Sequence, residues 1–229
     1  MMDIWTLIPV KSLKESKRRL ARLLPAEQRA ILIHGLLQHE LMILEEIPAI
    51  TQVLVVSSDP AVWQLARQFD AQVVEEIEPQ GLNIAIARGM AVASQNGAQG
   101  VLILPVDLPF ITISDITAVV NIGLEEKFNG NSTAKPLTID GNGSPGADGL
   151  QHVMAICADE DGDGTNALFF RPPSEFSFHF GPGSFRLHID EAHRRGLTVR
   201  TVTTPGLQFD LDNEKDWHAY QQMISMPDT

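Results

Sequence analysis

The 229-residue sequence is long enough for one large α/β domain or two small ones, and 44% of its residues are hydrophobic, which is ample for a core. Its formal net charge of −12 argues against nucleic acid or an anionic membrane as a partner, so an anionic substrate needs a local basic site. The single cysteine, Cys157, excludes an internal disulfide framework. With neither a signal-peptide pattern nor an apolar run near the ~20 residues of a membrane span, we expect a cytoplasmic protein.

A basic stretch follows the first predicted strand, residues 4–10. Residues 11–22 contain six of the 17 Lys and Arg residues and one acid, Glu15; the six are Lys11, Lys14, Lys17, Arg18, Arg19 and Arg22. A basic loop that leads into a helix N-terminus predicts a phosphate site formed by side chains and helix N–H groups. The stretch lacks the glycine pattern of a P-loop. The competing interpretation is an ordinary solvated helix face.

Strands and helices alternate along the first half of the chain. The pattern predicts strands at 4–10, 53–56, 73–74 and 101–104, and helices at 26–46, from Pro60 to Phe69, at 82–95 and at 112–120. Such alternation indicates βαβ units, so we expect one α/β domain, a three-layer α/β/α sandwich with a mostly parallel central sheet. Gly81 precedes the helix at 82–95 and allows a ligand close to the backbone, and Asn83 is a candidate reader of a base or ribose. A plain turn and helix cap is the alternative there.

Asp107 stands between Pro105 and Pro109 at the end of the apolar run 101–104. An apolar run of this kind is typical of a strand buried on both faces of a parallel sheet. Ligands of open α/β sheets bind beyond the carboxyl ends of the strands, which makes Asp107 a candidate site residue. Capping of the next helix is the alternative role.

Residues 129–149 are rich in Gly, Asn, Ser, Pro and Asp and have almost no apolar anchors. We interpret them as an exposed, flexible excursion from the single domain 1–229, with an active-site lid as the alternative.

Two small-residue motifs follow the predicted strand at 153–158. Thr165 offers a hydroxyl at a predicted strand-to-helix turn, after an acidic run whose resemblance to a calcium loop fails because Phe170 stands where that loop needs glutamate. Gly181 and Gly183 precede Ser184, which opens a predicted helix to His193, and exposed backbone N–H groups there predict a nest for a phosphate or carboxylate. Helix capping by the two hydroxyls is the alternative.

Asp210 and Asp212 follow a strand predicted through Val199 and Val202. Alternate residues of an extended segment point to the same side, so the two carboxylates form a candidate metal pair, with capping of the final helix as the alternative. The seven histidines lack metal-ligand spacing, and we interpret them as surface or packing residues.

Seven motifs in chain order resemble the CofC/FbiD guanylyltransferases, which make the phosphodiester precursor of the deazaflavin coenzyme (factor 420). The motifs are Ile8-Pro9-Val10-Lys11, Lys17-Arg18-Arg19-Leu20, Gly81-Leu82-Asn83, Leu104-Pro105-Val106-Asp107-Leu108-Pro109, Gly164-Thr165-Asn166, Phe180-Gly181-Pro182-Gly183-Ser184-Phe185 and Asp210-Leu211-Asp212. The resemblance covers nearly the whole chain except 129–149. The chain departs from it at Asp212-Asn213-Glu214, where the family more often has Asp-Thr-Pro.

The resemblance implies a nucleotide-diphospho-sugar transferase-like fold and transfer of GMP from GTP to a three-carbon phospho-acid. The candidate acceptors are phosphoenolpyruvate, which we favour, 2-phospho-L-lactate and 3-phosphoglycerate. It also implies Mg²⁺ as cofactor and a homodimer. The implied site, with the basic stretch, comprises Asp107, Lys17 and Arg19 for catalysis, Lys11, Gly81 and Asn83 for GTP, Thr165, Gly181 and Ser184 for the acceptor, and Asp107 with Asp212 or Asp210 for the metal.

The residue types fit phosphoryl-group chemistry, because a phosphate acceptor is already anionic and needs positioning and charge neutralisation rather than a nucleophile–His pair. Two alternatives remain at this point. One is a cytidylyl- or sugar-nucleotide transferase of the same fold, and the other is a non-catalytic acidic interaction module.

Overall fold

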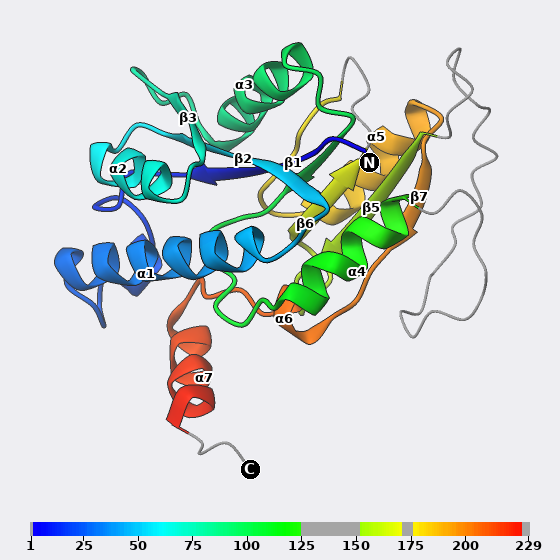
Figure 1. Cartoon of the computed structure of the whole chain (residues 1–229). Helices are drawn as coiled ribbons and strands as arrows, with labels where there is room; N and C mark the ends of the chain where they lie inside the picture. Colours follow the sequence, from blue (N-terminus) through cyan, green and yellow to red (C-terminus); the bar gives the residue numbers. More distant parts are fainter. Residues whose placement is uncertain (1, 125–151, 171–175, 226–229) are drawn as a thin grey trace.

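The computed structural model describes residues 2–124, 152–170 and 176–225. The predicted excursion at 129–149 lies outside the described residues. The described residues form one seven-stranded sheet of order β3-β2-β1-β4-β6-β5-β7 (Figure 1). Its strands are β1 (Ile4–Val10), β2 (Ile50–Ser57), β3 (Gln72–Glu75), β4 (Gly100–Ile103), β5 (Val153–Ala158), β6 (Thr165–Phe170) and β7 (Thr198–Thr201).

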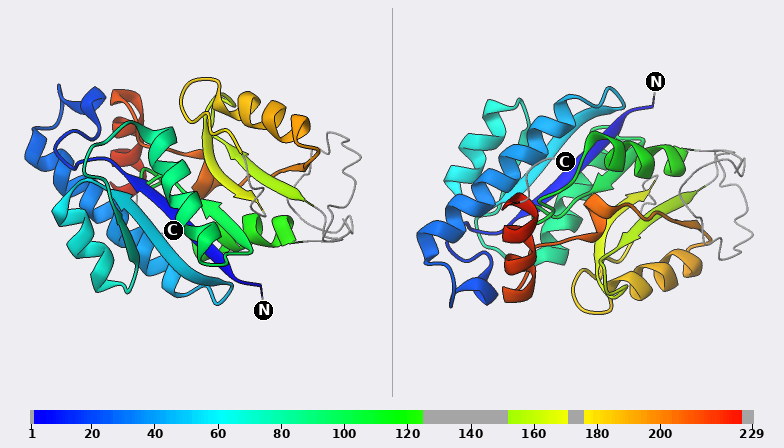
Figure 2. Two further views of the ribbon diagram at one scale, coloured as in Figure 1. Left: turned by 90° about the horizontal axis from the view of Figure 1, so that it is seen from above. Right: turned by 90° about the horizontal axis from the view of Figure 1, so that it is seen from below.

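Helices cover both faces of the sheet, as the alternation of strands and helices predicted (Figure 2). Side chains of β1 alternate between the two sides: Ile4 and Ile8 pack with one set of helices, Trp5 and Leu7 with the other. The first set is α1 (Ala26–Glu45), α2 (Pro60–Gln68), α4 (Ile113–Leu124) and α6 (Pro205–Gln208); the second is α3 (Leu82–Gln95) and α5 (Ser184–Arg194). The three-layer α/β/α sandwich is therefore confirmed.

The strand order places a ligand site at β1. β1 pairs in parallel with β2 on one side and with β4 on the other, so the chain reverses its direction of travel across the sheet at β1 and β4. At such a reversal the connections after the two strands diverge and leave a crevice at their carboxyl ends. Lys11 follows β1 and Asp107 follows β4, so both stand at this crevice.

The second half of the chain adds an antiparallel element. β5 and β6 form a hairpin, and β6 also pairs antiparallel with β4, while β7 is parallel to β5. Four of the six strand pairings are parallel, so the predicted mostly parallel sheet is confirmed. The prediction of a strand-to-helix turn at Thr165 is wrong, because Thr165 is the first residue of β6 and the run 165–170 is fully buried.

The basic stretch does not enter an α-helix. Residues 11 and 12 are irregular, residues 13–17 are turns, residues Arg18–Leu20 form the 3-10 helix η1, and α1 begins only at Ala26. The predicted helix N–H groups therefore do not contribute here, and the cations of this stretch act through side chains. The final helix, α7 (Glu214–Ser225), projects from the body of the molecule (Figure 1). Within the described residues, no helix combines the length and apolarity needed to cross a bilayer.

Candidate active site

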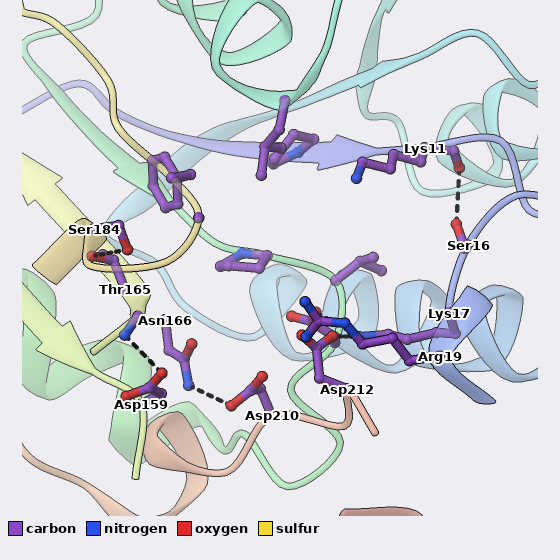
Figure 3. Close-up of a pocket in the computed structure, with 18 of the residues that line it drawn as sticks. Lys11, Ser16, Lys17, Arg19, Asp159, Thr165, Asn166, Ser184, Asp210 and Asp212 are labelled. Carbon is purple, nitrogen blue, oxygen red and sulfur yellow. Dashed lines mark hydrogen bonds and ion pairs between the residues drawn. The ribbon is translucent and has the colours of Figure 1, made fainter. Parts of the chain in front are cut away.

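A cavity of about 540 Å³ opens at the carboxyl ends of β1 and β4, beside the start of β6 (Figure 3). It brings together nine of the residues predicted from the sequence, which come from five separate parts of the chain. They are Lys11, Lys17, Arg19, Asp107, Thr165, Gly181, Ser184, Asp210 and Asp212. Figure 3 shows Lys17 and Arg19 reaching toward Asp212, with Thr165 and Ser184 across the cavity and Asp210 between.

Three carboxylates form a cluster in this cavity. Asp107 follows β4, and its backbone carbonyl accepts a hydrogen bond from the Leu211 N–H at 3.0 Å, which ties the segment 210–212 to the end of the central strand. Asp107, Asp210 and Asp212 each offer an oxygen within 4.8 Å of the others. Oxygen ligands at this spacing suit a hard divalent cation.

The ammonium group of Lys17 lies between two of these carboxylates. Its Nζ is 2.7 Å from Asp107 Oδ2 and 2.6 Å from Asp212 Oδ1, and the Lys17 side chain is only 6% exposed. Lys17 adopts a left-handed backbone conformation, with φ of 52°, just before η1. Arg19 does not lie between Asp107 and Asp212 as Lys17 does. It is 3.4 Å from Asp212, and its side chain is 72% exposed.

The pKa values of the cluster are shifted by burial and by the charges of neighbouring groups. Burial would lower the pKa of Lys17, but Asp107 and Asp212 raise it above its ordinary value. Burial, with the charges of Asp107 and Asp212, raises the pKa of Asp210 from 3.8 to about 7. Burial would also raise the pKa of Asp212, but Lys17 and Arg19 hold it below its ordinary value. Lys17 and Arg19 form ion pairs with Asp107 and Asp212 but not with Asp210, so a further cation would stabilise the ionised form of Asp210.

Neither aspartate of the 210–212 segment caps the final helix. The side-chain oxygen of Asn213 accepts from the N–H groups of Lys215 and Asp216, at 2.8 and 3.3 Å. The Asp216 carboxylate in turn accepts from the Asp212 N–H at 2.9 Å. The predicted capping role of Asp210 or Asp212 is therefore wrong, and both carboxylates face the cavity.

The basic stretch is anchored by Arg29, a buried residue of α1, and by Asp59, the half-buried N-cap of α2. The guanidinium of Arg29, on α1, donates to the backbone oxygens of Ser16 and Leu24 at 3.2 and 2.8 Å. Asp59 accepts from the Leu13 N–H at 2.9 Å, and its other oxygen accepts from Ala61 as the N-cap of α2. The loop that carries the cations therefore has a backbone fixed by the scaffold.

Two hydroxyls form the opposite wall of the cavity. Ser184 opens α5, and its Oγ lies 3.1 Å from Thr165 Oγ1 at the start of β6. Thr165 Oγ1 also lies 3.0 Å from Nδ1 of His188, which is fully buried on α5. Neither hydroxyl has the predicted alternative role of a helix N-cap, since Thr165 is in a strand and the N-cap of α5 is Gly183.

The predicted backbone nest before Ser184 is already filled. The Gly183 N–H donates to the Asp163 carboxylate at 2.9 Å, and the Phe185 N–H donates to the Asp163 carbonyl at 3.0 Å. The Ser184 N–H donates to the carbonyl of Gly181 at 3.1 Å. The prediction that these N–H groups hold an anion is therefore wrong. Besides the two hydroxyls, the cavity lining on this side includes Asn166 and the carboxylates of Asp159 and Asp163.

The remaining two predicted residues lie elsewhere. Gly81 caps α3 with φ of 102° and lines a second cavity of about 300 Å³, which shares Lys11 with the first. Asn83 is in the lining of neither of these cavities. Its amide accepts from the Phe180 N–H at 2.7 Å and donates to the Phe180 carbonyl at 3.1 Å, so it clamps the segment before Gly181.

His188 was missed from the sequence, where the histidines were interpreted as surface or packing residues. The signal was present, since His188 lies four residues after Ser184, on the same face of a predicted helix. Asn166, beside Thr165, was also given no role. Its amide donates to the carbonyls of Leu207 and Gln208 at 2.9 and 3.1 Å, and lies 3.5 Å from Asp210.

Comparisons with known proteins agree with this geometry. Residues 29–128 match the family described as MobA-like NTP transferase domain, and residues 149–221 match the family described as guanylyl transferase, CofC like. A phosphoenolpyruvate guanylyltransferase of Rubrobacter xylanophilus is 37% identical over 94% of this chain and 92% of its own length. One of Sphaerobacter thermophilus is 33% identical over 94% of this chain and 91% of its own length.

Solved structures of low identity share the fold. A Desulfovibrio desulfuricans protein described as a nucleotide-diphospho-sugar transferase superposes with a TM-score of 0.70 at 15% identity, over 98% of this chain and 89% of its own. CMP:2-keto-3-deoxy-manno-octonic acid synthetase gives 0.58 at 11% identity, over 97% and 98%. The predicted nucleotide-diphospho-sugar transferase-like fold is thus confirmed.

These relatives also decide between the alternatives left open by the sequence. A non-catalytic interaction module is excluded, and guanylyl transfer is favoured over cytidylyl or sugar-nucleotide transfer. With relatives above 30% identity along almost its whole length, the chain belongs to the CofC-like guanylyltransferase family and is a nucleotidyltransferase.

Proposed function

We propose that the protein transfers GMP from GTP to the phosphate group of phosphoenolpyruvate and releases pyrophosphate. The observation that carries the proposal is the composition of the main cavity, which has a carboxylate and ammonium cluster on one wall and a hydroxyl pair on the other. Two anionic substrates can meet between these walls. The names of the relatives from Rubrobacter xylanophilus and Sphaerobacter thermophilus support both the guanylyl donor and this acceptor.

In this reaction a phosphate oxygen of the acceptor forms a bond to the α-phosphorus of GTP. The bond between that phosphorus and the bridging oxygen of the β-phosphate breaks, and pyrophosphate leaves with its electron pair. The acceptor phosphate is an anion at neutral pH, so the protein needs no general base. The work of the protein is to align two anions and to neutralise their charge. Lys11 and Arg19, which are exposed cations of the cavity lining, fit the triphosphate.

The carboxylate cluster fits Mg²⁺. Asp107, Asp210 and Asp212 supply only oxygen ligands, and the Lys17 ammonium already occupies part of the cluster as a cation. These three residues would hold the ion. When bound, Mg²⁺ would supply neutralisation of the charge that develops on the transferring phosphoryl group and on pyrophosphate.

The second cavity fits the guanosine part of GTP. It adjoins the first, and its walls include Val10, Val56, Leu82 and Ala85, which suit the faces of a base. Glu76 contributes a carboxylate to the same lining; the Glu76 side chain is only 7% exposed and accepts from Arg88 at 3.1 Å. A carboxylate accepts hydrogen bonds only, and guanine offers two adjacent donors, its N1–H and its 2-amino group. Lys11 and Gly81 line this cavity, in agreement with their predicted contribution to GTP binding.

The proposal is tested by incubating the protein with GTP, Mg²⁺ and, separately, phosphoenolpyruvate, 2-phospho-L-lactate and 3-phosphoglycerate. We expect pyrophosphate release and a product whose mass equals acceptor plus GMP, fastest with phosphoenolpyruvate. ATP, CTP and UTP serve as donor controls. Faster turnover with another acceptor would correct the acceptor, and turnover with CTP in preference to GTP would refute the guanylyl donor.

A further inference from the structure

His188 lies behind the two hydroxyls of the main cavity and does not line the cavity itself. Its Nδ1 is 3.0 Å from Thr165 Oγ1, and its Nε2 is 2.9 Å from the backbone nitrogen of His179. Ser184 Oγ lies 3.1 Å from the same Thr165 oxygen. The hydrogen bonds of the imidazole thus reach the hydroxyl pair through one atom, the hydroxyl oxygen of Thr165.

The hydrogen bond from His179 determines which ring nitrogen of His188 carries the proton. A backbone N–H can only donate, so Nε2 must accept and must be unprotonated. Burial, with a smaller effect of His179, lowers the pKa of His188 from 6.5 to about 4, which keeps the ring neutral at pH 7. A neutral ring without a proton on Nε2 carries it on Nδ1. His188 therefore donates to Thr165.

This donation decides what the hydroxyl pair can offer a ligand. Thr165 and Ser184 have two hydroxyl protons, and one of them is used in the hydrogen bond between the two oxygens. Because His188 supplies a proton to Thr165 and takes none, the second hydroxyl proton is left for the cavity. With the opposite tautomer, Thr165 would donate to Nδ1 and Ser184 to Thr165, and the pair would present only lone pairs.

The difference matters for an anion. Phosphate and ionised carboxylate groups accept hydrogen bonds, so a wall that presents a proton attracts them and a wall of lone pairs repels them. The rings of Phe176 and Phe180 enclose His188, with centroid distances of 6.1 and 4.7 Å. An apolar enclosure of this kind makes an unsatisfied ring nitrogen costly, which holds the hydrogen-bond pattern in place.

We propose that His188 is a positioning residue that, through its Nδ1–H, makes the Thr165–Ser184 pair a hydrogen-bond donor to the phosphate or carboxylate group of the acceptor. The inference rests on the proposed function, since it concerns the acceptor in the same cavity. It assigns His188 no contact with the substrate and no part in proton transfer.

A double-mutant cycle tests the inference. Thr165→Val, His188→Leu and the double variant are compared for the KM of phosphoenolpyruvate at saturating GTP, for the KM of GTP and for melting temperature. We expect His188→Leu to raise the acceptor KM roughly 10- to 100-fold, as for a lost hydrogen bond to a charged group. The KM of GTP should stay within about twofold of the unaltered enzyme, because the hydrogen bonds of His188 go to Thr165 and to the His179 backbone rather than to the carboxylate cluster.

Because the inferred effect of His188 on the acceptor is transmitted by Thr165, the double variant should have the acceptor KM of Thr165→Val alone. His188→Asn, which keeps an amide N–H near the position of Nδ1, should recover part of the loss. If the increases in acceptor KM multiply in the double variant, or if the KM values of both substrates rise equally, the inference is overturned in favour of a packing role. Absence of turnover by the unaltered enzyme would refute the proposed function itself, and the inference with it.

If His188→Leu fails to fold, a measurement on the unaltered protein still tests the inference. Nitrogen-15 NMR of the histidine rings distinguishes a protonated Nδ1 from a protonated Nε2. We expect His188 to be neutral at pH 7 with the proton on Nδ1. A proton on Nε2 would overturn the inference, because Thr165 would then be a donor to His188.

Discussion

Asp107 is fixed at two points, which makes its charge testable apart from its place in the fold. Its backbone carbonyl accepts from Leu211, and its carboxylate contacts Lys17 and faces Asp210 and Asp212. A substitution that keeps the shape of the side chain should leave the first of these contacts intact.

Asp107→Asn removes one charge from the carboxylate cluster. We expect turnover to fall at least ~100-fold and the Mg²⁺ concentration for half-maximal activity to rise, because a ligand to the cation is weakened. Activity is measured over a Mg²⁺ titration, with Asp161→Asn as the control, an exposed aspartate of the turn between β5 and β6. Near-normal turnover with an unchanged melting temperature would exclude Asp107 from the reaction.

Variants of Lys17 and Arg19 allow a buried cation to be compared with an exposed one. We expect both Lys17→Ala and Arg19→Ala to raise the KM of GTP far more than that of the acceptor, because we assign their charges to the triphosphate in the proposed reaction. Lys17→Ala should also lower the melting temperature by several degrees, since Asp107 and Asp212 then face each other without the buried ammonium group. Arg19→Ala should not, because its ion pair is solvated.

The control for this pair is Arg22→Ala, which removes an exposed cation of the same basic stretch outside the cavity lining. The KM values are measured with each substrate varied separately, and the melting temperatures are measured by thermal unfolding. A rise in KM of the same size for both substrates would place these residues outside the GTP site.

At the scale of the elements, the connection between β3 and α3 forms one wall of the second cavity, which we assign to guanosine. Arg88, on α3, holds this connection by donating to the Glu76 carboxylate, to the Glu78 carbonyl and to the Gln80 side chain, at 3.1, 3.4 and 2.9 Å. The Glu76 carboxylate is therefore held in place by a residue of α3.

Glu76→Gln should change the base preference. Glutamine accepts one hydrogen bond and donates one, which matches xanthine, where a carbonyl replaces the 2-amino group of guanine. We expect kcat/KM for GTP to fall roughly 10- to 100-fold and that for xanthosine triphosphate to rise. Glu75→Gln is the matched control, because Glu75 pairs with Arg67 and is absent from the cavity lining. Retention of the GTP preference would place the base elsewhere.

At the scale of the whole molecule, the free energy of unfolding should depend on pH through His188. The unfolded chain binds this proton near pH 6.5, whereas the folded protein binds it only near pH 4, because burial lowers the pKa. The unfolded state thus binds more protons in this window, and the contribution to stability is lost as the pH falls from 6.5 toward 4.

His188→Asn should flatten this part of the pH profile, measured by urea unfolding at several pH values. The control is His218→Asn, an exposed histidine of α7. An unchanged slope in His188→Asn would show that other groups cause the loss of stability. The predicted homodimer and cytoplasmic location are likewise properties of the whole molecule; both stay predictions, and sedimentation analysis of the full chain checks the first.

Local patterns in the sequence determined the architecture. Alternation and continuous burial depend on neighbouring residues, so β1 could be identified as a strand, β4 as a strand buried on both faces, and Asp107 as the acid beyond a strand end. The run 165–170 was not identified as a strand, although its hairpin partner β5 lies directly before it; its other partner, β4, is distant in the chain.

Contacts between distant residues were decided only by the tertiary structure. Lys17 meets Asp107 and Asp212 across 90 and 195 residues of sequence, and Asp163 fills the nest at Gly183 from the neighbouring hairpin. His188 gains its role from Thr165, in a strand of the sheet. The physical reason is that residue types and short-range periodicity select the elements, whereas the order of the strands and the paths of the loops select which polar groups meet, and these follow from packing of the whole core.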